Sequence, residues 1–376
     1  MTPKARVDVK VLPPEHARIA ARRILLVSPM IRFALGPGDR ALVSAGQSVE
    51  AGTPIAELTP DAEYVEIGRL QRPGNGNGIS LGSGGAGAEP NEPGFERRQP
   101  PVPGMWWVGG GDRRGKAPDR HEQPRRKAGT LLFEMGGRWS AAVGERHETV
   151  ESPTAGVVTE ASNGLYVAIK VAGVAIPGAV AGGVPSRGYL DVPRLVDGEL
   201  RDTALDMGRS GAIVVAGGRV SAEALTRARA MSIRGIVAGS LGQGELRDMA
   251  ASEARQRSGL HPLPPFGVLG LDGHQRRPIA SPILALLAAL AGREVAIVTD
   301  PPLLVIDVLD VPLPELPPDW VRVRSGPHAG REGRWLGSAG LHRFRAGVHL
   351  EAANVRLGDD LTPTVVALAD LECLIF

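Results

Sequence analysis

The chain has 376 residues, of which 43% are hydrophobic and 22% are charged, and its formal net charge is +2. This balance is typical of a soluble protein with two or three domains and excludes a strongly acidic or strongly basic chain. The longest apolar run, residues 279–290, is well short of a membrane-spanning helix, which needs about 20 residues.

The N-terminal residues lack the apolar core of a secretory signal peptide. The single cysteine, Cys373, cannot form an internal disulfide or a thiolate metal cluster. We therefore expect a cytoplasmic protein with no membrane partner. The 50 glycines and 32 prolines favour short strands and many turns, and the low aromatic content leaves the cores to aliphatic residues.

Residues 24–62 alternate short apolar runs with Gly, Pro and Asp turns, which predicts strands. A composition break follows, because residues 68–128 are rich in Gly, Pro, Asn and Arg. Such a segment buries too little apolar surface to fold alone, so we interpret it as a disordered insertion. Its second half is basic and contains Trp106 and Trp107.

Strand patterns resume at Thr130, and two stretches, residues 38–58 and 151–183, share glycines spaced between short apolar runs. The first carries Val43, Gly46, Val49, Gly52 and Ile55, and the second carries Ser152, Pro153, Gly156 and Val158. These phrases resemble those of biotinyl and lipoyl domains. The resemblance implies a barrel-sandwich hybrid in two halves, residues 1–67 and 129–190. Lys170 lies inside a strand-like run and not at a turn, so the resemblance implies the fold without the modified lysine.

Strands and helices alternate through residues 191–310, which predicts an α/β domain with a parallel sheet and crossover helices. Strands are expected at 211–216, 233–239, 266–273 and 294–300. Helices are expected after Ser221, at 244–257 and within 278–292. Ser221 is a suitable N-cap for the first of these helices.

Two glycine-containing loops follow the first two of these strands, and helix N-termini after strands bind anions readily. Neither loop matches a dinucleotide or P-loop motif, so turn geometry is the alternative interpretation. The candidate anion-binding residues are Gly217, Gly218, Arg219, Ser221, Ser240 and Gly242. Asp272 and His274 follow the third strand and are interpreted as polar loop residues. The histidines show no metal-ligand spacing, and we predict no catalytic residue, no metal and no cofactor.

Residues 317–376 follow a proline-rich linker and carry the most specific pattern of the chain. Val321 and Val323 alternate with Arg322 and Arg324, which predicts a strand with an apolar and a basic face. Glycines and a proline then supply a turn. The candidate RNA- or partner-binding residues are Arg322, Arg324, Gly326, Pro327, Gly330, Arg331, Gly333 and Arg334.

This strand and turn, together with the closing Val366, Ala369, Leu371 and Glu372, resemble the KOW motif of NusG-type and translation-factor SH3-like barrels. Members of those families bind RNA, ribosomal proteins or RNA polymerase, so the resemblance implies a binding module. The arginines are of the type that contacts phosphates. A solvated strand face, or a barrel that only docks on its own chain, are the alternatives.

The sequence thus predicts a mixed multidomain fold: a β barrel-sandwich hybrid, an α/β parallel-sheet domain and a C-terminal SH3-like β-barrel. We expect a non-enzymatic binding protein that associates with RNA or a nucleic-acid-associated protein complex in transcription or translation. An accessory subunit or enzyme that binds a small anionic ligand in the α/β domain is one alternative. A structural scaffold within a protein complex is the other.

Overall fold

The computed structural model describes residues 19–59, 61–69, 105–107, 131–135, 138–146, 148–193, 199–257, 264–345 and 347–376. Most described elements are strands, with three α-helices among them, which confirms a β-rich multidomain fold. Contacts divide the chain into two units. The second unit falls within residues 58–148 and 257–262, and the remaining residues form the first. In the described part of the chain, no helix is long and apolar enough to cross a membrane.

The second unit contains a four-stranded sheet in the order β7-β10-β9-β8. Its strands are β7 (Asp61–Arg69), β8 (Met105–Trp107), β9 (Leu131–Met135) and β10 (Arg138–Arg146). The expected insertion, residues 68–128, is therefore a strand at its first two residues and again at Trp106 and Trp107, which pair with Leu132 and Leu131. The composition of the segment did not predict β8, because the strand that pairs with it, β9, is distant in the sequence. The rest of that insertion lies outside the described residues.

A nine-stranded sheet forms the centre of the first unit, in the order β15-β21-β20-β18-β16-β22-β23-β14-β2. Its strands are β2 (Leu26–Val27), β14 (Val174–Pro177), β15 (Val180–Gly183), β16 (Ser186–Asp191), β18 (Ala212–Ala216), β20 (Gly235–Ala238), β21 (Gly267–Gly270), β22 (Glu294–Thr299) and β23 (Pro302–Ile306). The four central strands β16, β18, β20 and β21 are parallel, and antiparallel strands flank them. A short pair, β17 (Glu199–Leu200) and β19 (Arg219–Val220), accompanies the sheet.

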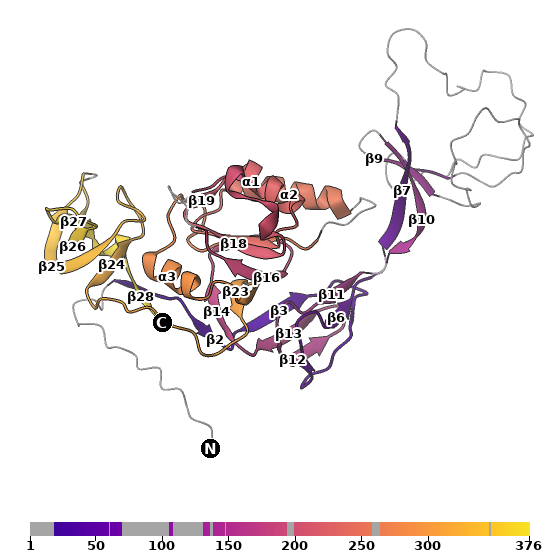
Figure 1. Ribbon diagram of the computed structural model, residues 1–376, viewed down its shortest axis with the longest axis horizontal. Coiled ribbons are helices and arrows are strands. Elements are labelled where there is room, and N and C mark those ends of the chain that lie inside the picture. The colour runs from indigo at the N-terminus through magenta and orange to yellow at the C-terminus, as the bar shows by residue number, and fades with distance from the viewer. Residues whose placement is uncertain are drawn as a thin grey trace, which may run out of the picture. The chain divides into compact units, whose positions relative to one another are not determined.

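Helices cover both faces of this sheet, as Figure 1 shows. The helices are α1 (Ala222–Ala230), α2 (Gln243–Arg257) and α3 (Ser281–Ala289). Helices α1 and α2 pack with one set of strand residues, which includes Val214 and Ile236. Helix α3 packs with the alternate set, which includes Ile213 and Val237. Successive strand residues point to opposite faces, and helices cover both faces. The strands are therefore apolar along their whole length, as predicted.

Two details of the α/β domain differ from expectation. The fourth predicted strand, β22, runs antiparallel to β16. The reason is that α3 returns the chain to the carboxyl end of β16, where the Gly292 N–H donates to the Leu190 carbonyl oxygen at 2.7 Å. Strands β14, β15 and most of β16 were expected in the second barrel half, up to residue 190. They belong to the nine-stranded sheet instead, because Val174–Pro177 pairs with β23 and Val180–Gly183 pairs with β21.

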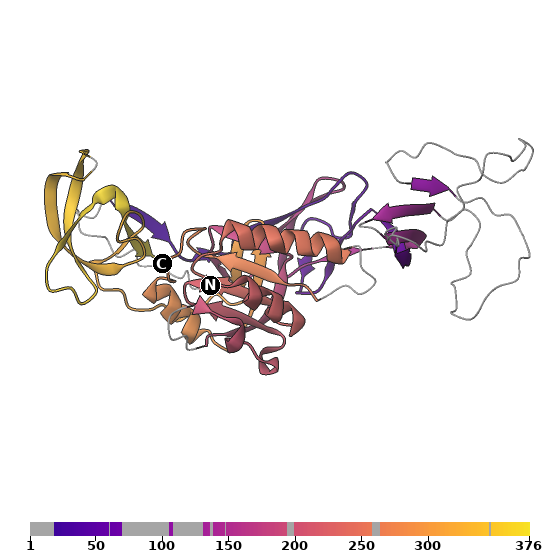
Figure 2. The ribbon, with the colours of Figure 1, turned by 90° about the horizontal axis from the view of Figure 1, so that it is seen from above.

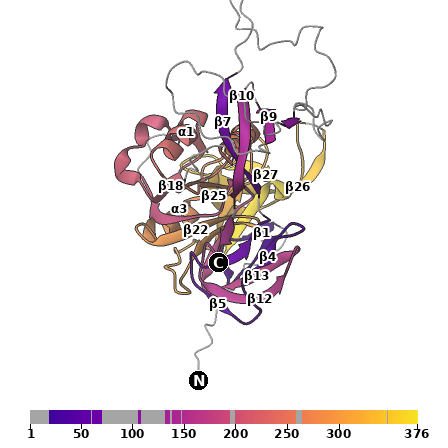
Figure 3. The same ribbon diagram turned by 90° about the vertical axis from the view of Figure 1, so that its right-hand side faces the viewer.

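The two glycine-containing stretches do come together, in two small sheets seen in Figure 3. Their orders are β11-β6-β4 and β3-β13-β12-β5. The strands are β3 (Met30–Ala34), β4 (Arg40–Ala41), β5 (Ser48–Val49), β6 (Pro54–Glu57), β11 (Thr149–Glu151), β12 (Gly156–Ser162) and β13 (Tyr166–Val171). Gly46 and Gly52 have φ of 86° and 81°, which favours glycine. Lys170 lies within β13, as the sequence predicted, and its position is exposed.

Residues 317–376 form a sheet that also takes in an N-terminal strand, in the order β1-β28-β24-β25-β26-β27. We call this sheet with its turns the C-terminal module (Figure 2, yellow). Its strands are β1 (Ala20–Arg23), β24 (Trp320–Val323), β25 (Glu332–Arg343), β26 (His349–Leu357), β27 (Thr364–Ala367) and β28 (Leu371–Ile375). Strand β1 pairs in parallel with β28, although the sequence placed it with the first barrel half. Val321, Val323, Trp335 and Val355 share the module's core.

Candidate functional site

The glycine-containing loops at the carboxyl ends of β18 and β20 lie beside each other, as the predicted anion site requires. Ser240 is buried, and its hydroxyl donates to the Gly218 carbonyl oxygen at 2.9 Å. Ser221 caps α1 by accepting a hydrogen bond from the Ala224 N–H at 3.1 Å, which confirms its predicted role as an N-cap. The side chains of these two serines are thus engaged by the chain itself.

Arg219 is also engaged, because its guanidinium donates to Glu245 at 2.7 Å. This hydrogen bond, more than any other influence, holds the pKa of Glu245 below its ordinary value. Gly242 faces the same carboxylate, since a Cβ there would lie 2.0 Å from Glu245 Oε2. Arg219, which was expected to bind an anionic ligand, is therefore neutralised by Glu245 of α2.

The segment 277–279 packs directly over the loops. The Ile279 N–H donates to the Gly217 carbonyl oxygen at 2.7 Å, and a Cβ on Gly239 would lie 2.2 Å from the Arg277 carbonyl oxygen. Ligands of open α/β sheets usually bind beyond the carboxyl ends of strands. Here the chain's own backbone lies at that position.

The same edge of the sheet carries a buried ionic cluster, made of Arg22, Asp272, Arg322 and Glu372. Asp272 follows β21, and its side chain is 3% exposed. Arg322 donates to Asp272 at 2.9 Å, to Glu372 at 3.2 Å and to the Pro278 carbonyl oxygen at 2.6 Å. Arg22 of β1 donates to the Asp272 carboxylate and, at 2.8 Å, to the Leu271 carbonyl oxygen. Two guanidinium groups and two carboxylates balance in charge.

The position of Arg322 corrects its assignment to an RNA-binding face. Its side chain is 1% exposed, because the loop after β21 covers the side of β24 that alternation predicted to face solvent. Burial acts to lower the pKa of Arg322, but the hydrogen bond to Asp272 and the charges of Asp272 and Glu372 raise that pKa above the ordinary value for arginine. Arg322 therefore joins two parts of the chain and is not available to a partner.

A second contact joins the C-terminal module to the α/β domain at the start of α3. Glu332 of β25 accepts a hydrogen bond from the Ser281 N–H at 2.7 Å and one from the Trp320 indole at 3.3 Å. Helix α3 has no side-chain cap of its own, so Glu332 satisfies a free N–H at its N-terminus. Gly330, with φ of 87°, approaches Pro278, and a Cβ there would lie 3.0 Å from Pro278 Cδ. Gly330 thus serves docking within the chain.

The remaining candidates in the turn after β24 stay at the surface. Arg324, Gly326 and Pro327 are exposed, and Gly326 has φ of 82°, as a tight turn requires. Arg331 is 43% exposed and donates to Asp360 at 2.8 Å, which lowers the pKa of that carboxyl. Gly333 lies where a Cβ would meet the Arg356 carbonyl oxygen at 2.1 Å, so it allows β25 and β26 to pair.

Strands β25 and β26 bring the candidate Arg334 opposite Arg356, an arginine that the sequence analysis did not single out. Arg334 is directly opposite Arg356 in the register, and both side chains are exposed. Arg334 is 66% exposed and reaches Asp319 only at 4.0 Å, and Arg356 makes no ion pair among the described residues. Like charges directly opposite each other destabilise a strand pair. This face therefore carries a positive charge that its own chain leaves largely uncompensated.

The far end of the same hairpin is both basic and apolar. Arg343 is opposite His349, and His342 packs edge-to-face on Phe344 with ring centroids 5.1 Å apart. Leu341 is 71% exposed. We call the exposed side chains of β25, β26 and their connection, with the half-buried Phe344, the hairpin surface; they are Arg334, Leu336, Ser338, Leu341, His342, Arg343, Phe344, Arg345, Val348, His349, Leu350, Glu351 and Arg356.

No protein-family model and no curated protein matches the chain. Among the described residues, no group of three or more His, Cys, Asp or Glu side chains is placed to hold a metal ion. The geometry of the hairpin surface is thus the main guide to function.

Proposed function

We propose that this chain is a non-enzymatic, cytoplasmic binding protein that contacts RNA through the hairpin surface of its C-terminal module. In this proposal the module is an SH3-like barrel of the KOW type, and the two small sheets around β12 and β13 are a barrel-sandwich hybrid that lacks a modified lysine. The glycines Gly326 and Gly330 of the turn and Gly333 of β25 support the first identification, since each has a backbone reason to be glycine.

The observation that carries the proposal is the pair Arg334 and Arg356. A cross-strand pair of arginines costs stability unless an anion lies between or beside them. Guanidinium groups bind phosphate oxygens in a bidentate manner, and a nucleic-acid backbone supplies such anions at regular intervals. His342, Phe344 and His349 add ring faces of the kind on which unpaired bases stack. Single-stranded RNA is the partner that uses both features.

This proposal can be tested with a fluorescent twelve-nucleotide oligouridylate and the double variant Arg334→Ala/Arg356→Ala. Loss of two phosphate contacts should make the slope of log K against log salt shallower by about 1.4, at roughly 0.7 per contact for a single strand. Fluorescence anisotropy at several salt concentrations measures this slope. The matched control is Arg40→Ala/Arg293→Ala, which removes two exposed arginines outside the module and should leave the slope unchanged. Equal slopes for both double variants would contradict the proposal.

A structural scaffold within a protein complex is the second candidate, and the buried cluster around Asp272 favours it. That cluster shows the module docked on its own chain through Arg322 and Arg22. Docking engages Arg322 and Glu332, whereas Arg334 and Arg356 stay exposed farther along the same face of the sheet, so docking is compatible with RNA binding. The alternative of a small anionic ligand at Gly217 and Ser240 has less support, because segment 277–279 covers those loops.

A further inference from the structure

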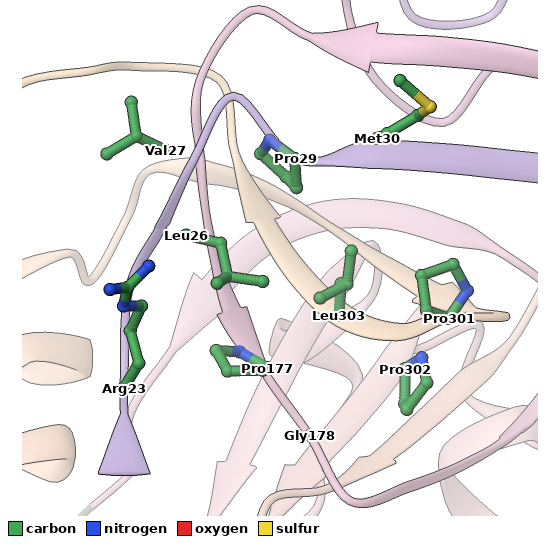
Figure 4. Close-up of a pocket in the computed structure, with 10 residues that line it drawn as sticks. All are labelled: Arg23, Leu26, Val27, Pro29, Met30, Pro177, Gly178, Pro301, Pro302 and Leu303. Atoms are coloured by element: carbon green, nitrogen blue, oxygen red, sulfur yellow. The ribbon is translucent and has the colours of Figure 1, made fainter. Parts of the chain in front are cut away.

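A recess of about 450 Å³ lies at the edge of the nine-stranded sheet that β2 forms. Figure 4 shows Arg23 at one end and Pro301 and Pro302 at the other, with Leu26, Pro177 and Leu303 between them. Leu303 is buried, whereas Val27 at the rim is 63% exposed. The volume falls in the range of small-molecule sites, about 300–1,000 Å³.

The walls of the recess are stiff. Proline has a fixed φ, so the backbone around Pro177, Pro301 and Pro302 has little freedom to collapse into the space. β14 and β23 pair with each other from Val174 to Pro177, which holds both walls on one sheet. A site that is already formed loses little conformational entropy when a ligand binds.

Arg23 is the only charged residue among those that line the recess. It ends β1, opposite Ile375 of β28, and is exposed. Its neighbour Arg22 is held in the buried cluster with Asp272, but Arg23 makes no ion pair with any residue that the structure describes. The recess therefore combines an apolar interior with one uncompensated cation.

We propose that this recess binds a small monocarboxylate whose apolar body lies against Leu26 and Leu303 and whose carboxylate pairs with Arg23. A guanidinium matches a carboxylate with two parallel hydrogen bonds. One guanidinium balances a single negative charge, so a monoanion suits the recess better than the dianion of a phosphate monoester. The site is separate from the hairpin surface and does not depend on RNA binding.

Octanoate, octanol and octyl phosphate are suitable probes, titrated by isothermal calorimetry into the full chain. Wild-type protein should bind octanoate with one-to-one stoichiometry and more tightly than either other probe. Arg23→Gln should weaken octanoate binding about tenfold or more and leave octanol binding unchanged, because only the charge-assisted hydrogen bonds are lost. Val27→Trp, a change at an exposed rim position, should weaken the binding of octanoate and of octanol. The control Arg40→Gln should change neither.

Three results would overturn the proposal: no octanoate binding to wild-type protein, equal octanoate affinity for wild type and Arg23→Gln, or tighter binding of octyl phosphate. Melting temperatures of the variants verify that each is folded. RNA affinity of Arg23→Gln should equal that of wild type, so failure of this proposal and failure of the RNA proposal are distinguishable.

Discussion

Replacing Asp272 by alanine should lower the free energy of unfolding of the first unit by about 3–5 kcal/mol, the usual effect of removing one partner from a buried ion pair. Asp272 is 3% exposed and accepts hydrogen bonds from both Arg322 and Arg22. Without it, Arg322 keeps only Glu372 and the Pro278 carbonyl oxygen while remaining buried. Urea denaturation followed by tryptophan fluorescence, to which Trp320 at this contact contributes, measures the loss.

The matched control is Asp360→Ala, which breaks the exposed pair with Arg331. Exposed pairs contribute about 0–1 kcal/mol, so this variant should be close to wild type. Arg322→Met should also cost about 3–5 kcal/mol, because Asp272 keeps Arg22 but Glu372, with a side chain 10% exposed, loses its partner. If Asp272→Ala and Asp360→Ala lose the same amount of stability, the cluster does not hold the C-terminal module in place.

Gly239→Ala should destabilise the first unit by about 1–3 kcal/mol, the range for overpacking a filled site. The Cβ would lie 2.2 Å from the Arg277 carbonyl oxygen and 2.9 Å from the Ile279 nitrogen, so the covering segment has to move. That movement should also weaken the hydrogen bond from Ile279 to Gly217. Thermal unfolding and hydrogen exchange at Ile279 measure the two effects.

Gly244→Ala is the control for this variant. Gly244 lies in the first turn of α2, and a Cβ there meets no atom within 4 Å. Alanine is the better helix former, so this change should be neutral or stabilising by about 0.4–1 kcal/mol. A loss of stability at Gly244 as large as that at Gly239 would show that crowding by segment 277–279 is not the cause.

Local features of this fold were predictable from the sequence. The cap at Ser221 and the strand–helix alternation from Ala212 to Thr299 depend on neighbours a few residues away, and both are confirmed. The direction of β22 was not predictable, because it depends on where α3 returns the chain. Pairing of β1 with β28 joins residues at opposite ends of the sequence, which no local pattern reveals.

The candidate site illustrates the same limit. Alternation along β24 placed Arg322 and Arg324 on one exposed face, and this holds for Arg324 only. Arg322 is paired in the interior with the carboxylate of Asp272, which lies in a loop 50 residues earlier in the sequence. The pair Arg334 and Arg356 was missed because its register depends on the irregular pairing of β25 and β26, which shifts after Trp335 and after Ser338. The only local signal for an exposed Arg356 was the alternating strand pattern around it.

These observations describe an outward face of the C-terminal module with two parts. The part near Arg322 and Glu332 docks on the α/β domain, and the part near Arg334 and Arg356 stays exposed as the start of the hairpin surface. Docking fixes the module without using Arg334, Arg343 or Arg356. The buried cluster and the exposed arginines therefore have separate roles, although the sequence placed arginines of both kinds in one motif.

Hydrogen exchange of the full chain with and without the oligouridylate tests this division most directly, because exchange rates report protection segment by segment. The account predicts slower exchange in β25 and β26, within residues 332–343 and 349–357, when RNA is added. It also predicts unchanged exchange in the loops at residues 217–221 and 239–242. Protection confined to those loops, or none at the hairpin surface, would contradict the account.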